Sequence, residues 1–290
     1  MRSVIFGNST SPAECHNLGV TVEIEQSNYS ISAGTCLHIW DCGGQDVFVN
    51  AYLDAGNGAS SAQRQMFSQV QCVVFVFDVG SADFEKEQAY FTQIIGKVSE
   101  YSKGANIFCL LHKMDLIPPC RKADFQRERF QRIHNYHLQH GSKAAIGQIQ
   151  FFGTSIWDES LFKAWSAIIC TIIPNLHTLE GEVQAVQRQF GSLRIEQTAV
   201  FDKSSMLLLA VWPPVAVEEE QCNWEQFSSI IKQYRKCAVE GGEFEEIRWR
   251  SGKHEWHFGT FRREFVFVLK VPLEESKEEL CALLSALKSL

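Results

Sequence analysis

The strongest constraint on the fold of this chain is an alternation of apolar runs with amphipathic segments. Residues 72–78 (CVVFVFD) and 106–112 (NIFCLLH) are continuous apolar runs, which are typical of parallel strands covered on both faces. Between them, residues 82–101 repeat apolar side chains at helical spacing. The later members of the series are a helix at 125–139, a strand at 148–155 and a helix at 159–173. The series predicts an α/β domain built on a parallel sheet.

Before this series, the chain alternates apolar and polar residues on both sides of a Ser-Ala-Gly turn. Strict alternation is the pattern of half-buried strands, and a short turn between two such runs favours an antiparallel pair. The sequence therefore predicts a hairpin with strands at residues 21–26 and 35–41.

The alternation of strands and helices ends at about residue 190, and a different order of elements follows. A hairpin with an Asp-Lys-Ser-Ser turn comes first, followed by a helix near Phe227, further strands at 244–249 and 264–271, and a last helix with leucines at helical spacing. This order predicts an α+β sandwich. We place the domain boundary near residue 180, which divides the chain into domains 1–180 and 181–290.

Composition narrows the function. A net charge of −7 and a pI near 5.7 argue against a general grip on nucleic acid, which needs a basic face. No apolar run approaches the ~18 residues of a membrane span, so we expect no direct membrane insertion and a cytoplasmic protein.

Ten cysteines without a C-x-x-C pair indicate reduced thiols. His134, His137 and His140 lack acidic or cysteine partners, so we interpret them as a solvated helix face rather than a metal site.

Acidic residues stand where predicted strands end. Asp41 and Asp115 each follow a strand, and open α/β sheets bind ligands at the carboxyl ends of their strands. Asp78 ends a third strand. Any one of these residues could simply be a helix cap or a turn residue. The combination of motifs around them is more specific than any single position.

The motif "DCGGQ", residues 41–45, has the order of the switch II element of GTP-binding proteins. In that element the Asp holds Mg²⁺ through water, a Gly amide meets the γ-phosphate and the Gln orients the attacking water. By itself "DxGGQ" also fits Arf-like proteins and heterotrimeric G-protein α subunits.

Two further motifs have the form of a guanine-reading site. "HKMD", residues 112–115, resembles the N-K-x-D element, in which the Asp accepts from two N–H groups of guanine and the Lys stem covers the base. "TSI", residues 154–156, follows the next strand, where such proteins present backbone amides to guanine O6. Thr21 opens the first hairpin strand, where a switch I threonine would ligate Mg²⁺, although a lone Thr there is usually only a strand residue.

With "WDCGGQD", "IFCLLHKMDL" and "TSIWDESLFKAWSAIICTIIPN", the chain resembles the Rag GTPases of the A/B type. His112 in place of the usual Asn, and the Trp-Asp after "TSI", point to Rag proteins rather than to Arf-like ones. The resemblance implies a Ras-like α/β G domain followed by an α+β roadblock/longin-like domain.

The resemblance also implies a site and a reaction. GTP would be hydrolysed to GDP with Mg²⁺ as cofactor and Gln45 as the catalytic residue. Thr21 and Asp41 would hold Mg²⁺, Asp41 through water, and Thr21 and Gly44 would sense the γ-phosphate. Guanine would be held by a set of five residues. These are His112, Lys113, Asp115, Ser155 and Ile156.

The implied partners are a C/D-type Rag GTPase, bound through the C-terminal domain, a scaffold complex on the lysosomal or vacuolar surface, and the target-of-rapamycin kinase complex. A cytoplasmic chain would thus reach that membrane surface through partners, as a nutrient-signalling switch.

One family element is not found. No G-x-x-x-x-G-K-[ST] loop occurs in residues 1–38, ahead of the switch II motif, and the first strand of the family is not recognisable either. In a Ras-like sheet that strand is central, so without it two neighbouring strands would keep unpaired backbone groups. Two interpretations stay open. Met1 is a truncated start, or the chain is a pseudo-GTPase that works as a dimerising scaffold.

Overall fold

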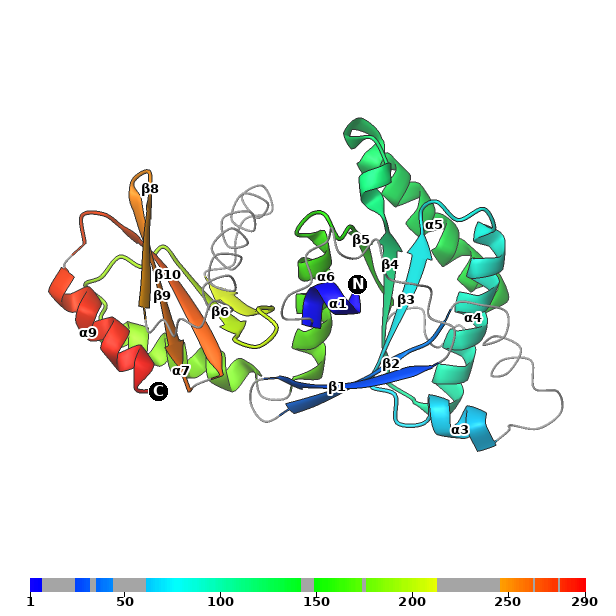
Figure 1. Ribbon diagram of the computed structural model, residues 1–290, viewed down its shortest axis with the longest axis horizontal. Coiled ribbons are helices and arrows are strands. Elements are labelled where there is room, and N and C mark those ends of the chain that lie inside the picture. Colours follow the sequence, from blue (N-terminus) through cyan, green and yellow to red (C-terminus); the bar gives the residue numbers. More distant parts are fainter. Residues whose placement is uncertain are drawn as a thin grey trace. The chain divides into compact units, whose positions relative to one another are not determined.

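The computed structural model describes residues 1–6, 24–31, 35–43, 61–141, 149–173, 176–212, 246–262, 264–275 and 277–290 (Figure 1). The chain divides into two compact units. The parallel-sheet unit comprises Pro12–Ser27 and His38–Ala164, and the antiparallel-sheet unit comprises Met1–Ser11, Asn28–Leu37 and Trp165–Leu290. The predicted boundary at residue 180 lies inside a helix, α7 (Leu176–Gln189), and stays a prediction.

The parallel-sheet unit is built on three parallel strands in the order β3-β4-β5, which confirms the predicted α/β series. The strands are β3 (Cys72–Asp78), β4 (Asn106–His112) and β5 (Ile149–Thr154). The helices and helical turns that connect or follow them are α3 (Ser61–Phe67), α4 (Phe84–Tyr101), η2 (Met114–Leu116), η3 (Pro119–Arg121), α5 (Lys122–His140) and α6 (Ser160–Ile172).

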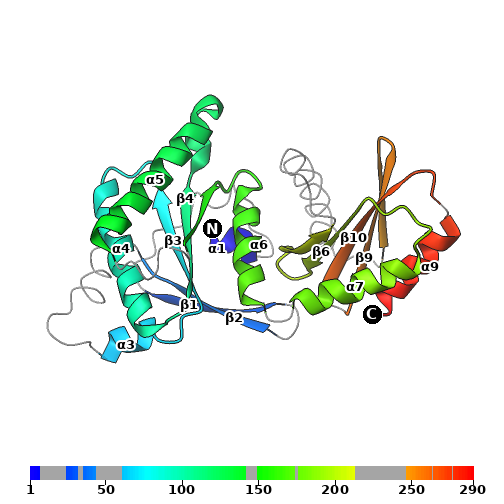
Figure 2. The ribbon, with the colours of Figure 1, turned by 180° about the vertical axis from the view of Figure 1, so that it is seen from behind.

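Helices α4 and α5 lie side by side against one face of this sheet (Figures 1 and 2). Phe91 and Ile95 of α4 and Ile133 of α5 pack on alternate residues of β4, Ile107 and Cys109 among them. All of these side chains are buried, and the phenyl rings of Phe91 and Phe77 are in contact. Burying this apolar face stabilises the sheet and keeps its strand ends in a constant register.

Strand β3 differs from the prediction that both of its faces are covered. β4 is buried over its five central residues, whereas β3 is mostly half-buried and Val76 is 40% exposed. Phe75 and Phe77 pack in the apolar cluster with α4 and α5, and Val76 between them points to the opposite face, where its side chain stays exposed. The prediction of an apolar run was correct, but the run alone could not show that one of its faces is only partly covered.

The predicted hairpin is present as a separate two-stranded sheet of β1 (Glu25–Ile31) and β2 (Thr35–Asp41). The second strand agrees with the prediction, and the first is displaced towards the turn. Its alternation continues through Tyr29 and Ile31, and Tyr29 stacks on Phe6 of α1 (Arg2–Phe6) with ring centroids 4.5 Å apart. The inward contacts of these two residues explain why the strand runs beyond residue 26.

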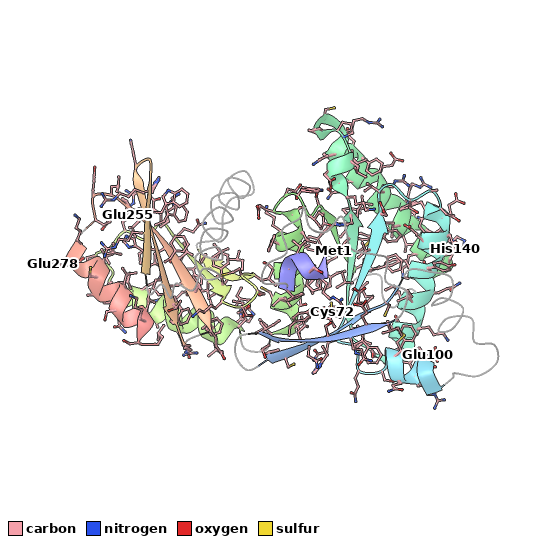
Figure 3. The ribbon with its side chains drawn as sticks, in the orientation of Figure 1. Met1, Cys72, Glu100, His140, Glu255 and Glu278 are labelled. Atoms are coloured by element: carbon pink, nitrogen blue, oxygen red, sulfur yellow. The ribbon has the colours of Figure 1, made fainter. Side chains whose placement is uncertain are left out.

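The antiparallel-sheet unit contains five strands in the order β7-β6-β10-β9-β8. They are β6 (Gln197–Asp202), β7 (Leu208–Trp212), β8 (Glu246–Ser251), β9 (His254–Phe261) and β10 (Phe265–Pro272). Helix α7 packs against α9 (Lys277–Lys288), whose acidic first turn includes Glu278 (Figure 3). The four predicted leucines of α9 are all buried. The predicted hairpin, the two later strands and the last helix are present, whereas β9 and α7 were not predicted. The predicted helix near Phe227 lies outside the described residues.

Two sequence predictions concern single residue types. The cysteines described here are free thiols, as expected, with Cys109 buried and Cys36, Cys120 and Cys281 exposed. His137 is only 1% exposed, so the prediction of a solvated histidine face on α5 was wrong at that position. Of the helices that the structure describes, none is long and apolar enough to cross a membrane.

Candidate functional site

The carboxyl ends of the three parallel strands bring three polar residues into one row. In the register of the sheet, Asp78 is paired with His112 and His112 with Thr154. The Nδ1 atom of His112 lies 3.0 Å from Oγ1 of Thr154, so a side-chain hydrogen bond joins β4 to β5 at this edge. Because Thr154 is fully buried, the bond fixes where the residues that follow each strand begin.

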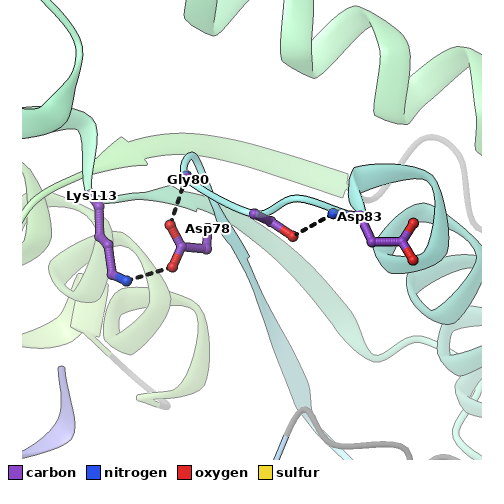
Figure 4. Close-up of polar contacts among 5 residues, drawn as sticks. Asp78, Gly80, Asp83 and Lys113 are labelled. Atoms are coloured by element: carbon purple, nitrogen blue, oxygen red, sulfur yellow. Dashed lines mark hydrogen bonds and ion pairs between the residues drawn. The ribbon is translucent and has the colours of Figure 1, made fainter.

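Lys113, the residue after β4, connects this edge to β3. Its Nζ lies 2.5 Å from Oδ2 of Asp78, and the other carboxylate oxygen accepts from the Gly80 N–H at 2.8 Å (Figure 4). Burial alone would raise the pKa of Asp78, but the hydrogen bonds from Lys113 and Gly80 outweigh it and lower the pKa. Lys113 has a left-handed backbone, with φ of 65°, which turns the chain from β4 into η2.

Asp115 in η2 and Ser155 after β5 form the second connection. The Ser155 hydroxyl donates to Oδ1 of Asp115 over 2.5 Å, and the same hydroxyl oxygen accepts from the Trp157 N–H at 3.1 Å. Ser155 is buried and Asp115 is exposed. The hydroxyl therefore orients a carboxylate whose remaining lone pairs face solvent, which is the geometry needed to accept hydrogen bonds from a ligand.

His112 is neutral at physiological pH. Burial lowers its pKa to about 4, so the imidazole carries no charge that would compete with Lys113 for the Asp78 carboxylate. A neutral ring can take part in the hydrogen bond to Thr154 as donor or acceptor. The histidine thus performs a connecting role within the edge, between β4 and β5.

The structure brings five of the predicted site residues to this one edge: His112, Lys113, Asp115, Ser155 and Ile156. Asp41 ends β2 in the other, two-stranded sheet. Thr21, Gly44 and Gln45 lie outside the described residues.

Asp78 and Thr154 were not assigned roles by the sequence, yet both contact predicted residues. Their position in the sequence could have indicated a place in the site. Each is the last residue of a strand next to β4, and parallel strands end at a common edge.

Of the two predicted Mg²⁺ ligands, Asp41 lies among the described residues, where it is a half-buried carboxylate at the end of a strand. The chemistry fits, because Mg²⁺ prefers oxygen ligands, keeps several waters and is commonly held by one or two protein groups plus phosphates. No cluster of three or more metal-binding side chains occurs among the described residues.

The parallel sheet, with a carboxylate, a hydroxyl and a lysine gathered at its carboxyl edge, fits a Ras-like α/β G domain. A sequence model of the Gtr1/RagA G protein conserved region matches residues 1–231. The chain belongs to the Gtr1/RagA family of G proteins, which confirms the predicted class, a Rag-type GTPase, and sets aside the Arf-like alternative.

Named relatives agree with this family. The chain is 31% identical to Ras-related GTP-binding protein A of Dictyostelium discoideum, over 87% of this chain and 78% of that protein. It is 32% identical to GTP-binding protein gtr1 of Schizosaccharomyces pombe, over 87% of this chain and 77% of that one. Identity to human Ras-related GTP-binding protein C is 26%, over 72% of this chain and 49% of that protein. The identity to the first two proteins is thus higher than the identity to protein C.

Proposed function

We propose that this chain is a Rag-type guanine-nucleotide switch subunit whose parallel-sheet unit binds GTP and GDP. The observation that carries the proposal is the Asp115–Ser155 pair at the carboxyl edge of β4 and β5. Guanine presents two adjacent N–H donors on one edge, and a carboxylate held by one hydroxyl keeps enough lone pairs to accept both. The buried hydroxyl of Ser155 restricts the rotation of that carboxylate, which lowers the cost of ordering it on binding.

The neighbouring residues complete the base site. The Lys113 side chain leaves the edge immediately before Asp115, and its alkyl stem would lie along the base while Nζ stays paired with Asp78. His112 and Thr154 hold the two strand ends together. Ile156, half-buried after Ser155, would present its backbone amide to the guanine carbonyl.

Hydrolysis of GTP to GDP and phosphate would use the residues of the "DCGGQ" motif. Gln45 would orient the attacking water, Gly44 would donate its amide to the γ-phosphate, and Asp41 with Thr21 would hold Mg²⁺. The ion supplies neutralisation of the charge on the β- and γ-phosphates. As in other enzymes of this class, we expect slow turnover without an activating protein.

The antiparallel-sheet unit supports the second half of the proposal. Its five-stranded antiparallel sheet with helices α7 and α9 is compatible with a roadblock-like domain. We propose that this unit forms a heterodimer with a C/D-type Rag GTPase, and that the dimer is held by a scaffold on the lysosomal or vacuolar surface. There it would signal amino-acid supply to the target-of-rapamycin kinase complex from an otherwise cytoplasmic pool.

One observation favours a second function. Among the described strands, β3 lies at the edge of the parallel sheet with Val76 exposed, and an open strand edge suits a protein-binding surface. A chain that reads the base but binds phosphate weakly would act as a pseudo-GTPase scaffold, working by heterodimerisation alone.

Nucleotide binding separates these functions. We expect fluorescent mant-GDP to bind the 290-residue chain, and Asp115→Asn to lower the affinity at least about tenfold, because an amide cannot accept from both guanine donors. The same substitution should raise the affinity for xanthosine diphosphate, whose C2 oxygen accepts the hydrogen bond that the new amide donates. Asp124→Asn, an exposed carboxylate of α5 paired with Arg127, is the matched control.

The scaffold hypothesis makes the opposite prediction. Dimerisation with a C/D-type partner would persist while neither nucleotide binds the wild type or Asp115→Asn. That pattern, measured by the same titrations and by size-exclusion chromatography of the mixed chains, would replace the switch with the scaffold.

A further inference from the structure

Two arginines of α5 lie over the same phenylalanine ring of α4. The guanidinium carbon of Arg129 is 4.2 Å from the centroid of the Phe84 ring, and that of Arg132 is 5.3 Å from it. Arg129 also lies 5.1 Å from the ring centroid of Phe125, so its guanidinium contacts two aromatic rings. Phe84 begins α4 and is buried, which gives both arginines a fixed support. We call these four residues the arginine–phenylalanine cluster.

The two guanidinium groups of the cluster are like charges held close together. Burial, and after it the positive charge of Arg132, lowers the pKa of Arg129, while the carboxylates of Glu128 and Glu87 act in the opposite direction. Both arginines stay protonated at neutral pH, because a guanidinium does not lose its proton in that range. Two neighbouring positive charges repel each other, and an anion bound to both would remove this repulsion.

Neither arginine of the cluster forms an ion pair with a carboxylate among the described residues. On the same helix, Arg127 is paired with Asp124, whereas Glu128 and Glu87 act on Arg129 from beyond ion-pair distance. The N–H groups of Arg129 and Arg132 also donate no hydrogen bond to a residue that the structure describes. The donors of both guanidinium groups are therefore available to a ligand.

We propose that the arginine–phenylalanine cluster binds an acidic segment of a partner protein, two carboxylates of which accept hydrogen bonds from Arg129 and Arg132. The fork of N–H groups on a guanidinium matches the two oxygens of a carboxylate, and such charge-assisted pairs are among the strongest hydrogen bonds in proteins. The two arginines are three positions apart on one helix, so they lie on the same face. Because the ring contacts already hold them, little side-chain freedom is lost when the segment binds.

Charge favours a short acidic segment over an extended anionic surface. The chain carries a net charge of −7, which opposes the approach of a membrane of acidic lipids or of nucleic acid. A peptide segment contacts only the local pair of positive charges, and the half-buried ring of Phe125 offers apolar surface to the stems of its side chains. No residue of the cluster belongs to the proposed nucleotide site, so this inference does not depend on nucleotide binding.

The test measures binding of a fluorescein-labelled peptide of alternating Glu and Ala residues to the 290-residue chain by fluorescence anisotropy. We expect the wild type to bind the peptide, and Arg129→Gln/Arg132→Gln to lower the affinity by about tenfold or more. Arg121→Gln/Arg127→Gln removes the same charge from exposed positions beside the cluster and is the matched control. Its effect should stay within about threefold, because exposed charges are screened by salt.

A second variant separates the geometry of the guanidinium from its charge. Arg129→Lys/Arg132→Lys keeps both positive charges and removes the planar fork, so we expect a loss of about threefold or more in affinity for the same peptide. A peptide with Gln in place of Glu should not bind the wild type. Thermal melts followed by circular dichroism check that each variant is folded.

Three results would overturn the proposal. The first is a wild type that does not bind the Glu peptide at low ionic strength. The second is an equal loss of affinity in the control and in Arg129→Gln/Arg132→Gln, which would assign the effect to net charge. The third is binding to vesicles of phosphatidylserine that requires Arg129 and Arg132 while the peptide does not bind, which would make the occupant a membrane surface.

Discussion

Lys113 Nζ lies 2.5 Å from Asp78 Oδ2, which joins the ends of two parallel strands through residues 35 positions apart in the chain. The contact occupies the ammonium group and leaves the stem along the candidate base site. Both side chains are more than a third exposed, with values of 53% and 37%, so solvent screens the pair. Its main effect is therefore on the position of the lysine and less on the stability of the unit.

Replacing Asp78 by Asn tests whether the ion pair contributes little to the stability of the unit. At pH 7 we expect a loss of less than about 1 kcal/mol in the free energy of unfolding, because the pair is solvent-screened. The folded pKa of Asp78 is lowered, so its contribution is present above the unfolded pKa, about 3.9, and is lost as the pH falls through the folded pKa. Urea denaturation should therefore show a smaller difference between wild type and variant at pH 3 than at pH 7. A difference that is larger at pH 3 than at pH 7 would contradict the assignment.

The lowered pKa of His112 leads us to expect a loss of stability in mild acid. Its folded pKa is about 4, below the unfolded value of about 6.5, so stability is full above pH 6.5 and declines as the pH falls towards 4. At pH 5 the expected loss is up to about 2 kcal/mol, from the 1.36 kcal/mol per pKa unit of this linkage. His112→Asn should remove most of that decline while keeping a hydrogen bond to Thr154. The exposed His140, labelled in Figure 3, provides the control substitution His140→Asn.

His137 is buried without a hydrogen bond to either ring nitrogen from any described residue. Its ring meets Phe91 edge-on at 5.8 Å, and burial together with His134 lowers its pKa. Because desolvating an imidazole costs free energy, we expect His137→Leu to raise the unfolding free energy by about 1 kcal/mol. The gain should be larger at pH 5 than at pH 7.5, since protonation in the unfolded state no longer competes. Thermal melts at both pH values check this, and a less stable variant at pH 5 would refute it.

Two strand glycines should respond differently to an added methyl group. A Cβ at Gly259 of β9 would clash with the buried ring of Phe267, whereas a Cβ at Gly153 of β5 would meet only the end of the flexible Gln126 side chain. We expect Gly259→Ala to cost about 1–3 kcal/mol and Gly153→Ala to cost much less. The double variant Gly259→Ala/Phe267→Leu should recover part of the loss, because the smaller side chain makes room. If the changes in the free energy of unfolding of the two single variants simply add up in the double variant, the clash is excluded as the cause.

Much of the parallel-sheet unit could be predicted from local patterns. The continuous apolar run of β4 and the helical spacing in α4 specify their elements, because burial on both faces or on one stripe dictates where apolar side chains stand. In the antiparallel-sheet unit the hairpin of β6 and β7 and the leucines of α9 were predicted in the same way, whereas β9 and α7 were not.

The site was predictable where chemistry is concentrated in short motifs. His112, Lys113 and Asp115 are contiguous, and Ser155 stands directly after a strand, so their common edge followed from the parallel topology. The contacts of Lys113 with Asp78 and of His112 with Thr154 were not predictable. They depend on which strands are neighbours and on the register between them.

The sequence by itself determined the strands and long helices from β3 to α6 and the residues proposed to read a guanine edge, since propensity, periodicity and side-chain chemistry are local properties. Only the tertiary structure decided that β3 lies at the edge of the described parallel sheet, that Val76 is exposed and His137 buried, and that Ser155 orients Asp115. Those outcomes depend on hydrogen bonds and packing between segments distant in sequence, as in the Asp115–Ser155 pair, whose members are separated by 40 positions. No local pattern encodes such a pairing, because its free energy exists only once the sheet has formed.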